Sequence, residues 1–203
     1  MKSTAVTLIA CAVCGSAFAA DTNTATITFT GRIIEEACRF STDTGNQTIN
    51  LGVYPQSYFT NRDTTTEAKP FSLKIEGCTI TKTDVGENLP ADRIRLTFTD
   101  TNSSGSQSNG LLANENTEGA AENVGILVNY KSSDDTTAET QLFEDSATGT
   151  QVRTLNQFSY ASDDSDSVRE ATLDFTAAMK PTSDTMPTVG QVKGQMTVLL
   201  ETF

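Results

Sequence analysis

Apolar and polar residues alternate one by one in two separate parts of this chain. Between Thr24 and Ile33, one face of the pattern holds the small or apolar residues Ala25, Ile27, Phe29, Gly31 and Ile33. From residue 190 to the last residue the alternation returns, and one face holds Val192, Met196, Val198 and Leu200. A period of two residues predicts a β-strand with one buried face, so both segments are expected to lie in a sheet.

The same alternation recurs through the middle of the chain, where helical patterns are missing. Further strands are predicted near residues 49–53, 71–77, 93–99, 124–130 and 171–179, with a weaker signal at 152–160. Turn-rich stretches at 101–110, 131–137 and 161–167 separate them. Because many short strands divided by turns are typical of two packed sheets, we predict an all-β sandwich in a single domain.

The first residues have the features of a secretory signal peptide. Lys2 supplies a positive charge, and small or apolar residues follow it as far as Val13. Ala17-Phe18-Ala19 has the A-x-A form of a cleavage site, so residues 1–19 are expected to be removed and the mature chain to begin at Ala20. A lipoprotein signal ending at Cys11 is the alternative, but the apolar run before Cys11 is short.

Cysteine content fits an exported protein. Cleavage would remove Cys11 and Cys14 and leave Cys38 and Cys78 in the mature chain. An even pair in an oxidising compartment is interpreted as a disulfide. A metal site or a reactive thiol is the alternative, but the chain has no histidine, and two cysteines alone do not make a zinc site.

Composition argues against several classes of function. A formal net charge of -12 disfavours binding to nucleic acid or to anionic lipid. Without histidine, no Ser-His or Cys-His catalytic arrangement can form. The adjacent Glu35 and Glu36 would point to opposite faces of a strand, and the acidic run from Asp163 to Asp166 lacks the remaining ligands of a calcium loop. We therefore predict no enzyme activity, no catalytic residue, no cofactor and no metal.

Five segments in order resemble one protein family. They are the alternating stretch that runs from Thr26 to Ile34, Cys38 after it, the stretch from Phe71 to Cys78, the stretch from Asn123 to Val128, and the stretch from Leu173 to Ala177 with the alternating tail. Together they are similar to the chaperone–usher fimbrial subunits of the type 1 pilin family, over essentially the whole mature chain. The separation of the two cysteines also matches that family.

The resemblance implies an incomplete immunoglobulin-like sandwich, the pilin fold, which is completed by a donor strand from another molecule. Such donor-strand complementation is an established case of β-strand addition. The resemblance divides the chain into a signal peptide (1–19), an N-terminal donor-strand extension (20–30) and a pilin domain (31–203). The expected donor face is Asn23, Ala25, Ile27 and Phe29. The acceptor groove and chaperone contact are expected at Ile33, Val192, Met196, Val198, Leu200 and Phe203.

The implied function is that of a structural fimbrial subunit that polymerises by donor-strand exchange and supports bacterial adhesion. Its expected partners are neighbouring fimbrial subunits, a periplasmic chaperone, an outer-membrane usher and, through the fibre, a host surface receptor. The expected location is a fimbrium on the bacterial surface, reached through the periplasm. A minor tip, adaptor or terminating subunit, or a carbohydrate-binding fimbrial adhesin, is the alternative.

One departure from the family concerns the C-terminal end. The family usually has a tyrosine at the penultimate position, where this chain has Thr202 followed by Phe203. Phe203 is the nearest aromatic residue, but an adjacent position in a strand points to the opposite face.

Overall fold

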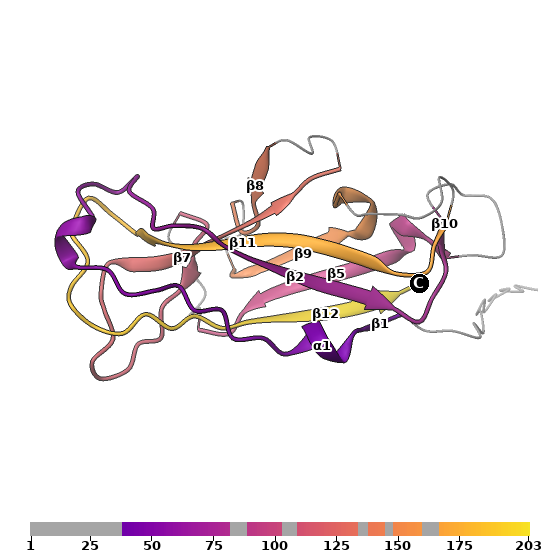
Figure 1. The fold of residues 1–203 in the computed structure, drawn as a ribbon, viewed down its shortest axis with the longest axis horizontal. Helices are drawn as coiled ribbons and strands as arrows, with labels where there is room; N and C mark the ends of the chain where they lie inside the picture. The colour runs from indigo at the N-terminus through magenta and orange to yellow at the C-terminus, as the bar shows by residue number, and fades with distance from the viewer. Residues whose placement is uncertain (1–37, 82–88, 103–108, 134–137, 145–147, 160–166) are drawn as a thin grey trace, which may run out of the picture. The chain divides into compact units, whose positions relative to one another are not determined.

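Two antiparallel β-sheets form the framework of the described chain (Figure 1). The computed structural model describes residues 38–81, 89–102, 109–133, 138–144, 148–159 and 167–203. All of these belong to one of two compact units, Ile34–Phe203. The other unit, Met1–Ile33, lies outside the described residues. The predicted signal peptide and donor-strand extension therefore also lie outside them.

The larger sheet has the strand order β1-β2-β11-β7-β6, with β8 paired to β7. Its strands are β1 (Arg39–Phe40), β2 (Lys69–Glu76), β6 (Leu112–Ala113), β7 (Val124–Lys131), β8 (Glu139–Gln141) and β11 (Ala171–Pro181). The long strand β11 is its centre, because it pairs with β2 along one edge and with β7 along the other. Figure 1 shows β2 and β11 running side by side over most of their length.

The second sheet has the order β12-β5-β9. Its strands are β5 (Ile94–Asp100), β9 (Thr150–Thr154) and β12 (Met196–Thr202). A small third sheet joins β10 (Ser167–Val168), β3 (Ile80–Thr81) and β4 (Leu89–Pro90). Within the described residues, helical structure is limited to α1 (Thr42–Gly45) and the 3-10 turns η1 (Gln56–Tyr58), η2 (Ala91–Arg93) and η3 (Leu155–Gln157).

The hydrophobic core lies between the two main sheets. Ile94, Leu96 and Phe98 point inward from β5 and are fully buried. From the other sheet, Leu173 and Phe175 meet them, and the rings of Phe98 and Phe175 lie 5.9 Å apart. Alternate residues of each strand thus fill one shared core, as packed sheets require. The predicted all-β sandwich is confirmed.

Most predicted strands form, and one does not. Strands occur at 71–77, 93–99, 124–130 and 171–179, and the weaker 152–160 signal becomes β9 followed by η3. The strand predicted at 49–53 is wrong, because this segment has no strand and Val53 is 98% exposed. Gly52 has a φ of +91°, which breaks the extended backbone, and its N–H donates to Asn50 Oδ1 in a local turn.

Candidate functional site

The inner face of β12 is apolar but only half-buried. Met196, Val198 and Leu200 pack against the main core, and Val192 does so just ahead of the strand. The residues between them face outward, and Leu199 is 57% exposed. The structure thus brings together four of the six residues expected to line a groove. Their burial differs from that of the equivalent residues on β5, all of which are fully buried.

Further half-buried side chains pack against the same core from the other sheet. Phe71 projects from β2, and its ring stacks on Phe175 with centroids 5.1 Å apart. Phe40 lies in the two-residue strand β1 and Cys38 just before it, and among the described residues β1 pairs with the end of β2. We call this set the apolar stripe: Cys38, Phe40, Leu51, Phe71, Val192, Met196, Val198 and Leu200. The sequence interpretation missed Phe40 and Phe71 as members, although Phe71 shares the alternation of Leu73 and Ile75.

The backbone of β12 is paired along one edge. The N–H of Thr101 donates to the carbonyl of Gln195 at 3.0 Å, and the N–H of Phe203 donates to the carbonyl of Arg93 at 3.1 Å. These contacts place the N–H and C=O groups of odd-numbered residues on the β5 side, and in an antiparallel pair the even-numbered residues point to the other edge. Among the described residues, no strand pairs with that other edge.

The same edge continues ahead of β12. Gln191 donates its N–H to the carbonyl of Gly119 at 2.9 Å, and its own carbonyl accepts from the N–H of Ala121 at 2.8 Å. The carbonyl of Lys193 accepts from the N–H of Glu115 at 2.9 Å. The odd-numbered residues of this segment are thus bonded to the loop 114–121 in place of a strand. The even-numbered edge therefore runs from Val192 to Thr202, and we call it the accepting edge.

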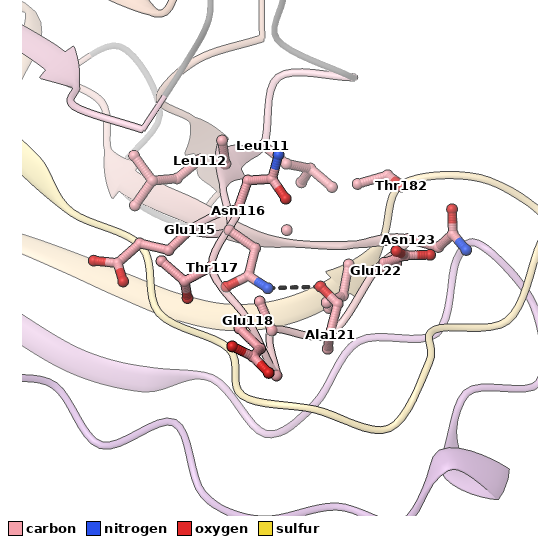
Figure 2. Close-up of a pocket in the computed structure, with 16 residues that line it drawn as sticks. Leu111, Leu112, Glu115, Asn116, Thr117, Glu118, Ala121, Glu122, Asn123 and Thr182 are labelled. Carbon is pink, nitrogen blue, oxygen red and sulfur yellow. Dashed lines mark hydrogen bonds between the residues drawn. The ribbon is translucent and has the colours of Figure 1, made fainter.

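The loop 114–121 also borders a hollow of about 480 Å³, which Figure 2 shows. Its lining mixes polar and apolar residues and includes Asn116, Glu118 and Asn123, together with Thr182, which follows β11. The dashed line in Figure 2 is the hydrogen bond from the Asn114 amide to the carbonyl of Ala121, at 2.7 Å. This bond lies inside the loop and holds its two ends together.

A disulfide fixes the start of the described chain. Cys38 and Cys78 are bonded with an S–S distance of 2.07 Å, so the predicted pair is present in the structure. Next to it, Arg39 and Glu76 are cross-strand partners and form an ion pair at 3.2 Å. The disulfide thus ties the start of β1 to the residues that follow β2, and Cys38 itself is a member of the apolar stripe.

Phe203 does not lie where it was predicted. It was expected in the groove, but it lies on the outward face, where its ring is 54% exposed and packs under the guanidinium of Arg95. The physical reason is its odd position in the alternation that puts Leu200 and Val198 inside. The remaining expected site residues, Asn23, Ala25, Ile27, Phe29 and Ile33, lie outside the described residues, as do Glu35, Glu36 and the acidic run 163–166.

The described residues contain no cluster of three or more side chains suited to holding a metal ion. None of the described helices has the length and apolar character needed to cross a lipid bilayer. Among the described residues, the accepting edge runs beside the half-buried side chains of the apolar stripe.

Comparison with known proteins places the chain in a family. Among relatives, long polar fimbria protein A of Salmonella typhimurium (strain LT2) is 37% identical over 128 residues, which is 62% of this chain and 66% of that protein. The probable major fimbrial subunit LpfA of Escherichia coli O157:H7 is 38% identical over 82 residues, or 40% of this chain and 46% of that protein. The matched stretches thus span less than two thirds of either relative.

Solved structures also align with the chain. The crystal structure of the P pilus rod subunit PapA covers 88% of this chain and 100% of its own, with 18% identity and a TM-score of 0.48. The family described as Fimbrial protein matches residues 27–201, which is most of the sequence. That family is a structural one and not a class of enzymes. The predicted family is confirmed, and this chain belongs to the fimbrial protein family.

Proposed function

We propose that this chain is a structural subunit of a chaperone–usher fimbria and that it polymerises by donor-strand exchange. The extension 20–30 of one copy lies along the accepting edge of the next copy, and its apolar face covers the apolar stripe. The observation that carries the proposal is the accepting edge, whose backbone groups have no strand partner among the described residues and which runs beside half-buried apolar side chains.

The physics of such an interface follows from its two components. A strand added to the accepting edge gains a ladder of main-chain hydrogen bonds, each contributing about 0.5–1.5 kcal/mol net. Burial of Ile27 and Phe29 from the donor adds roughly 3–6 kcal/mol at about 25 cal/mol per Å². Because side chains alternate with a period of two, a slip of one residue would turn these apolar residues to solvent, so the register is defined.

The proposal also gives the chain its partners and its route. An unpaired edge beside apolar side chains would promote aggregation of a newly exported subunit. A periplasmic chaperone would cover this edge until an outer-membrane usher brings in the next subunit. In this route the signal peptide first directs export and is cleaved after Ala19. The assembled protein resides in a fimbrium on the bacterial surface. Adhesion to host surfaces would follow from the fibre as a whole.

Two changes test the donor strand. Deletion of residues 20–26 is expected to leave a subunit that binds its chaperone but cannot attach to its neighbour. Ile27→Asp is expected to abolish polymerisation, since it places a charge on the buried face of the donor. Thr28→Asp, one residue further on and on the opposite face, is the matched control and should have a milder effect.

The measurement is the length and number of fibres seen by electron microscopy with immunogold labelling of this chain. Labels along the whole shaft would identify a major subunit, whereas one label per fibre would identify a tip or base subunit. Fibres of normal length from the deleted chain would refute strand exchange through residues 20–26. An equal response to Ile27→Asp and Thr28→Asp would refute the register proposed for the donor.

A further inference from the structure

The side-chain amide of Asn114 bonds to the backbone on both sides of Val192. Its Oδ1 accepts from the N–H of Lys193 at 2.6 Å, and its Nδ2 donates to the carbonyl of Gln191 at 3.1 Å. The same Nδ2 donates to the carbonyl of Ala121 at 2.7 Å. One side chain therefore bonds to Gln191 and Lys193, on either side of Val192 in the segment ahead of β12, and ties them to the loop 114–121.

This contact has the chemistry of a strand partner. A primary amide offers one carbonyl acceptor and N–H donors, as a backbone peptide group does. In an extended chain, the carbonyl of Gln191 and the N–H of Lys193 point to the same edge, and a paired strand normally satisfies both. Here, where β5 no longer reaches, the Asn114 amide bonds to both groups, and the backbone N–H of Ala121 also donates to the Gln191 carbonyl at 2.8 Å. Residues 191–193 are thus bonded along this edge although they lie ahead of β12, with one isolated bridge between Gln191 and Ala120.

Other contacts hold the segment in the same position. The carboxylate of Glu115 and the ammonium of Lys193 lie 2.6 Å apart. Gly190 and Gly194 allow a close approach, because a Cβ added to Gly190 would lie 2.4 Å from the backbone N of Ala121. A Cβ added to Gly194 would lie 2.6 Å from Cδ1 of Ile126. The segment 190–195 is thus packed between the loop 114–121 and β7, and the Asn114 amide contacts the middle of the segment.

We propose that Asn114 is a positioning residue for strand exchange and sets how long a donor strand the subunit accepts. By holding residues 191–193 extended, it lengthens the accepting edge from the seven residues of β12 to about eleven. This inference rests on the proposed function. The donor expected from the sequence, 20–30, has the length that this extended edge can pair.

Donor peptides of different length test the proposal on the full mature chain. The probes are a fluorescent peptide with the sequence of residues 20–30 and two peptides shortened by four residues, one at each end. With the unchanged chain, one of the shortened peptides leaves Val192 and Gly194 uncovered. The full peptide is expected to dissociate about tenfold more slowly than this shortened peptide. The net free energy of about one additional hydrogen bond corresponds to a tenfold change in the rate of dissociation.

Asn114→Leu removes the amide and should bring this ratio of dissociation rates close to one, while the shortened peptide dissociates at an unchanged rate. Asn116→Leu is the matched control, because Asn116 is exposed in the same loop, and the ratio should persist. Asn114→Asp keeps an oxygen for the N–H of Lys193 but cannot donate to Gln191, so an intermediate ratio is expected. It also serves as the test if Asn114→Leu does not fold.

The outcomes separate the two proposals. A ratio that survives in both Asn114 variants overturns the positioning role and leaves strand exchange intact. Failure of all three peptides to bind the unchanged chain refutes strand exchange itself. Hydrogen–deuterium exchange at the amide of Lys193 gives an independent measurement, since the positioning role requires faster exchange in Asn114→Leu than in Asn116→Leu.

Discussion

The guanidinium carbon of Arg95 lies 4.5 Å from the centre of the Phe203 ring. The last residue of the chain therefore packs on the outer face of the β5–β12 pair, while Leu200 and Val198 pack on the inner face. The two faces of β12 thus have different tasks. The side chains of the inner face are part of the apolar stripe, and on the outer face Phe203 contacts Arg95 of the neighbouring strand β5.

Phe203→Ala should cost little stability. A cation–π contact at an exposed site is worth about 0.5–1 kcal/mol, so the free energy of unfolding should fall by that amount in urea titrations. Phe71→Ala is the comparison, because Phe71 is half-buried and stacks on Phe175. It should cost about 3 kcal/mol. Equal losses from the two substitutions would contradict the assignment of Phe203 to the outer face.

Gly194→Val should destabilise the domain. A Cβ at this position would meet Cδ1 of Ile126 at 2.6 Å and Cδ2 of Leu112 at 2.9 Å, and overpacking of this kind costs about 1–3 kcal/mol. Gly45→Ala in α1 is the control, since its nearest neighbour would be 3.8 Å away. The midpoint of thermal unfolding should fall for the first variant and stay nearly unchanged for the second.

Removal of the disulfide should weaken the domain considerably. The two cysteines are separated by 40 residues. Closing a loop of that length stabilises a fold by roughly 3–4 kcal/mol. The double variant Cys38→Ala with Cys78→Ala should therefore show a lower free energy of unfolding and a lower yield of exported protein. A thiol assay on the intact mature chain provides the direct check, because any titratable thiol at these positions would refute the bond.

Asp100→Ala should leave two backbone groups without partners. The buried carboxylate of Asp100 accepts from the N–H of Ala113 at 2.8 Å and from the N–H of Asn102 at 2.9 Å. An unsatisfied buried donor costs about 1–3 kcal/mol, so the variant should unfold at clearly lower urea concentration. Asp100→Asn keeps one acceptor and should lose less. The exposed Asp92→Ala is the control, with a change within about 0.5 kcal/mol.

Alternation alone was sufficient to predict the strands that are paired on both edges. Ile94, Leu96 and Phe98 alternate strictly with polar residues, and β5 forms where that pattern lies. The same rule failed around Val53, because the pattern carries no information about the positive φ of Gly52. A glycine inside an alternating run was a signal of that break.

Of the residues in the candidate site, those on the apolar face of β12 and just ahead of it were predictable from the sequence, whereas Asn114 and Phe40 were not. The apolar face from Val192 to Leu200 follows from periodicity. Asn114 could not be found in this way, because its partners Gln191 and Lys193 lie far along the chain and a lone asparagine in a loop gives no sign of them. Phe40 escaped for a similar reason, since two residues of strand show no period.

The order of strands in the two sheets has a consequence for the time that folding takes. Leu73 pairs with Leu173, and Leu96 pairs with Leu200, so both sheets close only by joining segments about 100 residues apart. Chains dominated by such distant pairings fold in milliseconds to seconds, which is slow for a domain of this size. Throughout that interval the strands of both sheets are exposed to proteases and to other unfolded copies. We therefore expect the amount of protein that reaches the cell surface to depend on how quickly the chain is captured after export, more than on the stability it finally attains.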